Sequence, residues 1–122
     1  MIIAGILLLL AFAVSGWSAE VQYPTKQIHM WVGFAAGGST DILCRSISNV
    51  AEKILGQPII VENKPGGGGA LLLGLLSSVR PDGYTVATTS DTPYTRAPHL
   101  INVKYDSMKE FFPIIAIWKA GK

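Results

Sequence analysis

One segment of eight residues carries the residue types that could bind an anion. It consists of Phe34, Ala35, Ala36, Gly37, Gly38, Ser39, Thr40 and Asp41. Its two glycines allow the backbone to turn and expose amide N–H groups, and the helix expected after it adds the positive end of its dipole. We therefore expect a carboxylate or phosphate site, to which the hydroxyls of Ser39 and Thr40 could add donors. The alternative is an ordinary strand-to-helix turn that binds nothing.

A second polar segment follows the third expected strand. It begins with Ser90, Asp91 and Thr92 and continues to Thr95. In open α/β sheets, ligands bind beyond the carboxyl ends of the strands, and both segments would lie there. We therefore expect Ser90, Asp91 and Thr92 to line the same site as residues 34–41, with a plain surface loop as the alternative.

The other motifs exclude several kinds of site. No lysine precedes Ser39 as in a phosphate loop, no G-x-G-x-x-G run indicates a dinucleotide site, and no serine stands in a G-x-S-x-G elbow. The single cysteine, Cys44, and the two histidines, His29 and His99, lack metal-ligand spacing, so we expect no metal and no cofactor. The net charge of +2 is too small for a nucleic-acid-binding surface.

The elements that must position these residues follow from hydrophobic periodicity and from glycine and proline. Strands are expected at residues 28–34, 59–62, 84–89 and 113–118, and helices at 42–55, 70–79 and 106–112. A flexible loop is expected at 63–69 and a polar loop at 90–98. Because strands and helices alternate, the expected fold class is α/β, with a parallel sheet and flanking helices.

The helix at 42–55 has the clearest pattern. Ser39, Thr40 and Asp41 are suited to its N-cap, and Gly56 ends it as a C′ residue. Its apolar residues recur at spacings of three and four and are expected to form one buried face. They are Ile42, Leu43, Ile47, Val50, Ala51, Ile54 and Leu55. Asp41 and Arg45 stand four residues apart, and we expect an exposed ion pair between them.

The composition divides the chain into a leader and one small domain. The 122 residues are 49% hydrophobic and 15% charged, which excludes a disordered, highly charged chain. Within residues 1–19, which carry no charged side chain, Ile2–Val14 is an almost unbroken apolar run. This run is shorter than the about 20 residues of a membrane-spanning helix but fits a secretory signal. We expect 1–19 to be a signal peptide or signal anchor and 20–122 to be the exported domain.

Several motifs together resemble one family, the periplasmic solute-binding receptors of tripartite tricarboxylate transporters, known as the Bug or TctC family. The motifs are Tyr23-Pro24-Thr25-Lys26, Phe34–Asp41, Gly56-Gln57-Pro58, Val61-Glu62-Asn63-Lys64-Pro65-Gly66, Pro81-Asp82-Gly83-Tyr84-Thr85, Pro98-His99-Leu100, Tyr105-Asp106 and Phe112-Pro113-Ile114. Each is moderately specific alone, and their occurrence in the family's order makes the resemblance specific.

The resemblance implies a periplasmic-binding-protein-like fold of type II, with two α/β lobes and the ligand between them. In the family, the loop matching Phe34–Asp41 receives a carboxylate of the ligand, largely through backbone amides and ordered waters. The loop matching Ser90–Thr95 lines the same cleft. The resemblance thus implies a periplasmic, non-enzymatic receptor for small carboxylates, with a membrane permease as its partner and without nucleic acid.

Two departures from the family's pattern concern the first loop and the length of the chain. Family members often have prolines where Ala35 and Ala36 stand, so we expect a less rigid loop here. Members are also much longer, so we expect residues 20–122 to form a partial first lobe, truncated before the second lobe.

Two other interpretations stay open on the sequence alone. One is a truncated, non-functional gene product that associates with copies of itself to cover exposed apolar surface. The more remote one is a small exported enzyme, whose hydrolytic set would combine Asp41, Asp82, Asp91 and His99, although nothing in their spacing requires it.

Overall fold

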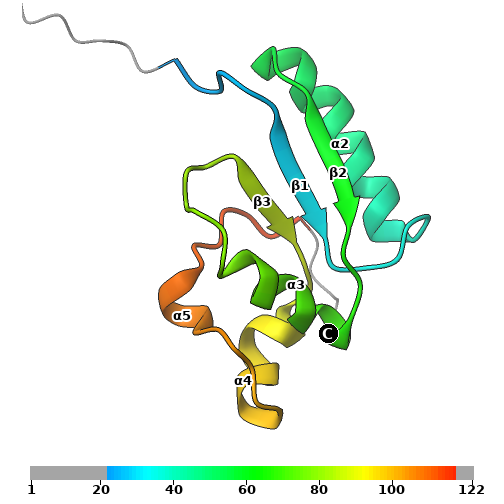
Figure 1. Cartoon of the computed structure of the whole chain (residues 1–122). Coiled ribbons are helices and arrows are strands. Elements are labelled where there is room, and N and C mark those ends of the chain that lie inside the picture. Colours follow the sequence, from blue (N-terminus) through cyan, green and yellow to red (C-terminus); the bar gives the residue numbers. More distant parts are fainter. Residues whose placement is uncertain (1–21, 118–122) are drawn as a thin grey trace, which may run out of the picture.

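A parallel sheet flanked by helices forms the described part of the chain. The computed structural model describes residues 22–117 (Figure 1). The strands are β1 (Ile28–Val32), β2 (Ile59–Asn63) and β3 (Thr85–Thr88). The helices are α2 (Ser39–Leu55), α3 (Ala70–Leu76), α4 (Ala97–Leu100) and α5 (Ser107–Glu110), with a 3₁₀ turn η1 (Gly67–Gly69) and a π-helical turn η2 (Thr92–Arg96). The α/β class and the parallel sheet are confirmed, and the predicted leader, 1–19, lies outside the described residues.

The order of the strands changes direction at the central strand of the sheet. The strands pair in the order β2-β1-β3, and both pairings are parallel. The end residues of central strand β1, Ile28 and Val32, are buried, and the three residues between them are half-buried. The chain runs from β1 to β2 on one side and then crosses to β3 on the other side. The carboxyl edge between β1 and β3 is therefore a topological switch point, where ligands bind in such sheets.

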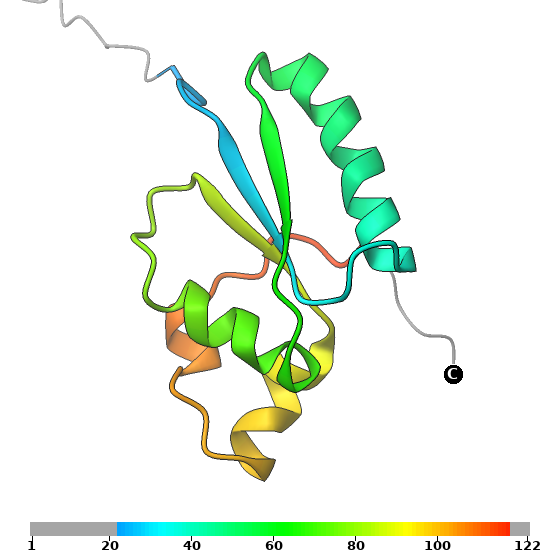
Figure 2. The ribbon, with the colours of Figure 1, turned by 45° about the vertical axis from the view of Figure 1, so that its right-hand side comes forward.

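Helices lie against opposite faces of this sheet (Figure 2). On one face, the Ser48 hydroxyl of α2 contacts the Met30 sulfur of β1 at 3.6 Å. On the other face, a Cβ placed on Gly33 would lie 3.2 Å from Cδ2 of Leu72 in α3. Leu72 and Val32 are fully buried, so the core lies where α3 meets the carboxyl end of β1.

Helix α2 begins and ends on glycines. Its N-cap is Gly38, and no side chain caps it, so the prediction that Ser39, Thr40 and Asp41 provide the N-cap is wrong. The helix starts earlier than expected and takes these residues into its first turn, because Gly38 already has the extended conformation that an N-cap needs. Gly56 ends the helix as predicted, with a left-handed φ of 69° and an amide that donates to the Glu52 carbonyl.

The buried face of α2 differs from the prediction. Asp41, Cys44 and Ser48 are its buried residues, whereas Val50 is 58% and Ile54 is 78% exposed. The small side chains of Cys44 and Ser48 allow the helix to lie close to the sheet, and a narrow strip of the helix makes the contact. The apolar residues spread over a wider arc than this strip, so several of them face outward.

The segment after β2 is more ordered than the predicted flexible loop. Gly67–Gly69 form the turn η1, which leads directly into α3, and α3 ends at Leu76 rather than at residue 79. At Gly69, with a φ of +101°, an added Cβ would lie 2.5 Å from Thr89 Oγ1 and 2.9 Å from Pro93 Cγ. A glycine is therefore required there by both backbone conformation and close packing.

The last third of the described chain corrects two predictions. Residues 92–100, expected within a polar loop and an undefined stretch, form η2 and α4. The predicted helix near 106–112 is confirmed as α5, whose N-cap Asp106 accepts a hydrogen bond from the Met108 amide. Residues 113–117 pair with no strand in the described range, and Trp118 lies outside it. Pro113 has no amide to donate to a ladder, which disfavours the predicted strand.

Candidate functional site

The loops that follow the three strands meet at the carboxyl edge of the sheet (Figure 1). The Gly33 amide, directly after β1, donates to the Thr88 carbonyl at 3.0 Å, and the Lys64 amide, after β2, donates to the Val32 carbonyl at 2.7 Å. Built on Gly33, a Cβ would lie 3.4 Å from Thr89 Oγ1. Gly33, directly before the first predicted binding segment, therefore lies against Thr88 and Thr89, directly before the second, at the switch point between β1 and β3.

The loop from Phe34 to Gly38 presents its middle to solvent. Phe34 and Thr40 are half-buried, whereas residues 35–39 are exposed. Gly37 has a φ of +80°, which favours glycine, and the Gly38 amide donates to the Ala35 carbonyl at 3.3 Å. The first amide groups of an α-helix have no partner within it, and Gly38 supplies no side chain to cap them. The first turn of α2 thus offers N–H donors to an anion, whereas the Gly37 and Gly38 amides donate to Asp41 and to the Ala35 carbonyl.

Asp41 is the internal anchor of this loop. Its carboxylate accepts hydrogen bonds from the Gly37 amide at 2.8 Å, from Arg45 Nε at 3.1 Å and from Asn63 Nδ2 at 2.9 Å. The Asp41 side chain is only 5% exposed, so the predicted exposed ion pair is corrected to a buried carboxylate held by a half-exposed arginine. Asp41 is thereby occupied by the protein's own donors.

These hydrogen bonds also fix the charge of Asp41. The Arg45 guanidinium, followed by the Gly37 amide and the Asn63 side chain, lowers the pKa of Asp41 from 3.8 to about 2. The carboxylate is therefore ionised at neutral pH, and the adjacent guanidinium balances its negative charge. A group with so low a pKa is a weak proton acceptor, which makes it unsuited to general base catalysis.

The second predicted segment lies at the start of η2. Ser90, two residues after the end of β3, is half-buried, and Asp91 and Thr92 are exposed at the beginning of the helical segment. Instead of a loose loop, this segment is a helical turn in which the Thr95 hydroxyl donates to the Asp91 carbonyl at 2.9 Å.

The sequence analysis missed two polar residues at this edge. Asn63 ends β2 and contacts the β1–α2 loop, and the Thr89 hydroxyl is buried with no hydrogen-bond partner in the described part of the chain. A polar residue at the end of a predicted strand, next to a glycine-rich segment, was the available signal for Asn63. Thr89 could not be singled out, because its environment depends on the close approach of Gly69.

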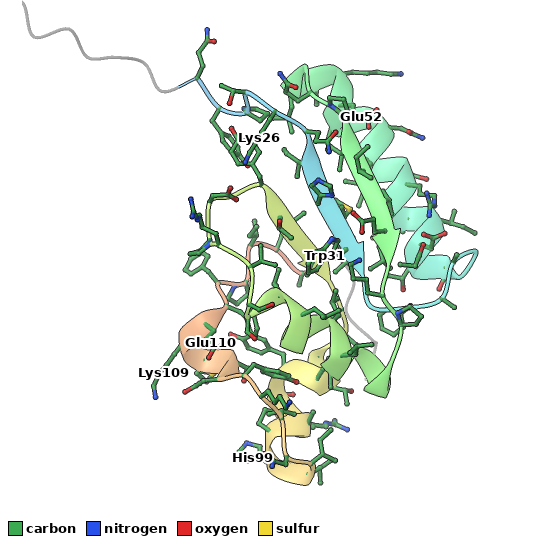
Figure 3. The ribbon with its side chains drawn as sticks, viewed as in Figure 1. Lys26, Trp31, Glu52, His99, Lys109 and Glu110 are labelled. Atoms are coloured by element: carbon green, nitrogen blue, oxygen red, sulfur yellow. The ribbon has the colours of Figure 1, made fainter. Side chains whose placement is uncertain are left out.

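The residues of the remote hydrolytic set do not converge. Asp82 pairs with Lys26 at 3.1 Å, ahead of β1 and thus at the amino edge of the sheet, whereas Asp41 follows β1. Figure 3 shows Lys26 and His99 at opposite ends of the molecule. A hollow lined by Lys26, His29 and Arg80 also lies at the amino edge, away from the predicted site. Residues 22–117 contain no group of three or more potential metal ligands, and none of their helices is long and apolar enough to cross a membrane.

Comparison with known proteins identifies a consistent set of relatives. The family described as "Tripartite tricarboxylate transporter family receptor" matches residues 43–121. The UPF0065 protein in the gbd 5′ region of Cupriavidus necator is 42% identical over 108 residues, which is 86% of this chain and 33% of that protein. The chain thus spans about a third of the length of this curated relative.

Solved structures show the same relationship. The structure of MatC from Rhodopseudomonas palustris with bound malate matches with a TM-score of 0.67 and 35% identity, covering 75% of this chain and 31% of that one. An R. palustris structure with adipate matches with a TM-score of 0.56 and 30% identity, covering 59% of this chain and 24% of that one. Each of these matches covers more than half of this chain rather than one motif.

Proposed function

The chain belongs to the tripartite tricarboxylate transporter receptor family, and we propose that it provides the carboxylate-binding loops of a periplasmic solute-binding receptor. The observation that carries this proposal is the uncapped start of α2 beside an exposed glycine turn at the switch point of the sheet. Amide groups at such a position bind negatively charged groups, because the donors and the helix dipole act together.

The ligand that fits this site is a small molecule with at least one carboxylate. Two structurally similar proteins, at 35% and 30% identity, are described with malate and with adipate, both of which are dicarboxylates. In this proposal residues 34–40 receive one carboxylate through their amides and hydroxyls, and Ser90, Asp91 and Thr92 line the same site. Asp41 contributes as the anchor of the loop rather than as a contact to the ligand.

Binding rather than catalysis is the proposed activity. The acid nearest the loop, Asp41, is held ionised by three donors, and Cys44, the chain's single thiol, is fully buried. Neither side chain is available as a base or nucleophile for a bound carboxylate. We extend the proposal to export by the leader at 1–19, to a periplasmic location and to delivery of the ligand to a membrane permease, as in the family.

Isothermal titration of the 122-residue chain with malate tests the ligand class. We expect saturable binding with a dissociation constant on the order of 1 mM, because the loops bury only one end of the ligand. Dimethyl malate is the matched control, since it has the same carbon skeleton without the charges, and it should not bind. Equal binding of acid and ester, or no binding of malate at tens of millimolar, would contradict the proposal.

A further inference from the structure

The side chain of Asn63 joins three separate parts of the candidate site. Its Nδ2 donates to the Phe34 carbonyl at 3.1 Å and to Asp41 Oδ1 at 2.9 Å, and its Oδ1 accepts from Arg45 Nη2 at 3.1 Å. We propose that Asn63 is the positioning residue of the β1–α2 loop and holds it in the shape that receives the ligand's carboxylate. The ligand in this statement rests on the proposed function, whereas the positioning role can be tested without it.

The hydrogen bonds of Asn63 explain why an asparagine suits this position better than an aspartate or an alanine. A primary amide has two N–H donors and one carbonyl acceptor, and all three functions are used here. Aspartate has nearly the same shape but no donor, and it would place a second carboxylate against Asp41. Alanine would leave the Phe34 carbonyl and one oxygen of Asp41 without this partner.

The position of Asn63 explains how one side chain controls a loop. Asn63 ends β2 and pairs in register with Val32, the last residue of β1, so the sheet fixes its backbone beside the start of the loop. It fixes the beginning of the loop at Phe34 directly and the end at Gly37 through Asp41, whose other oxygen accepts the Gly37 amide. Ala35 and Ala36, between these two hydrogen-bonded positions, are exposed and accessible to a ligand.

Two consequences for binding follow from this arrangement. The loop is ordered when the protein folds, so a ligand need not supply the free energy of ordering it. Arg45, held by both Asp41 and Asn63, also keeps a positive charge beside the Asp41 carboxylate. Without that balance, the buried carboxylate would repel an incoming anion.

The decisive variant is Asn63→Ala, measured by amide hydrogen exchange on the ¹⁵N-labelled 122-residue chain. We expect the Gly37 amide to exchange about tenfold faster relative to the amides of β1, since one hydrogen bond of this kind contributes up to about a factor of ten. The pKa of Asp41 should rise, and Asn63→Asp should release the loop in the same way. If malate binds the wild-type chain, its dissociation constant should increase by about tenfold in Asn63→Ala.

Two control variants separate positioning from general stability. Ile59→Val removes one methyl group from a buried residue at the other end of β2, so it should lower the melting temperature without changing Gly37 exchange relative to β1. Asn49→Ala changes an exposed asparagine of α2 and should leave Gly37 exchange relative to β1 unchanged. The proposal is overturned if Asn63→Ala leaves Gly37 exchange and the Asp41 pKa at wild-type values, or if Ile59→Val changes both equally.

A measurement on the wild-type chain decides the case in which the variants do not fold. The side-chain NH₂ protons of Asn63 should exchange more slowly than those of Asn102, which is exposed. Equal exchange rates for the two side chains would contradict the positioning role. If wild-type protein binds no malate while Gly37 and Asn63 are protected as described, the proposed function fails and the positioning role stands.

Discussion

Asp41 shows, at the scale of single residues, how one buried carboxylate can hold a loop in place. The sequence predicted it as a binding residue and as half of an exposed ion pair. The structure buries it under Arg45 and ties it to Gly37 and Asn63. Sequence spacing could identify the i, i+4 pair with Arg45, but not the contact with Asn63, which depends on the pairing of β1 with β2.

The stability of the protein should therefore depend on Asp41 at neutral pH. Since the pKa of folded Asp41 is about 2, below the ordinary 3.8, its stabilising effect is present above about pH 4 and is lost as the pH falls towards 2. Asp41→Asn should lower the melting temperature by several degrees at pH 7 and by much less near pH 2. Thermal melts at both pH values test this, with the exposed Asp91→Asn as the control.

If Asp41→Asn lowers the melting temperature by the same amount at pH 7 and near pH 2, this account is contradicted. Some acid sensitivity should remain in the variant, because the pKa of Glu62 is lowered by Lys64 and His29, and that of Asp82 by the Tyr84 amide and Lys26.

Gly69 provides a second test at the residue scale. In Gly69→Ala, the new Cβ would lie 2.5 Å from Thr89 Oγ1 at a φ of +101°, so we expect a loss of about 1–3 kcal/mol of unfolding free energy. Gly74→Ala is the matched control, because no atom lies within 4 Å of its added Cβ and it stands inside α3. That variant should stabilise by about 0.5–1 kcal/mol, measured by urea unfolding. Similar effects of the two substitutions would contradict the close packing at Gly69.

At the scale of elements, periodicity predicted where helices form better than which face they bury. The bounds of β1, β2, β3 and α2 agree with the prediction to within a few residues. The face of α2 was wrong because small residues, Cys44 and Ser48, set the contact with the sheet. The helical state of residues 92–100 was missed because the polar, proline-containing sequence is typical of loops, and packing of Pro93 against Gly69 is not a local signal.

The exposure of α2's apolar residues can be tested by substitution. Ile54 is 78% exposed, so Ile54→Lys should change the free energy of unfolding by no more than about 0.5 kcal/mol. Cys44 is fully buried against the sheet, so Cys44→Leu should cost about 1–3 kcal/mol through overpacking. Chemical denaturation of the two variants measures both effects. A larger loss of stability in Ile54→Lys than in Cys44→Leu would indicate that α2 buries the apolar face predicted from the sequence.

At the scale of the whole molecule, the chain brings two predicted binding segments to one edge of its sheet. It spans about a third of the length of its curated relatives, and its three-stranded sheet places the loop after β1 beside the segment after β3. The family, the α/β class and the position of both loops at the carboxyl edge were predictable, because motif order and strand-helix alternation determine them. The two-lobed receptor and the truncation before its second lobe remain predictions.

The central claim is that the carboxylate meets the start of α2 and the loop before it. The most direct test is a ¹H–¹⁵N titration of the 122-residue chain with malate, because it identifies the amides that respond. We predict the largest shifts at Ser39 and Thr40, whose amides begin α2, with smaller ones at Ser90–Thr92 and none with dimethyl malate. Shifts confined to the hollow around Lys26 and Arg80 at the amino edge, or no shifts at all, would contradict the account.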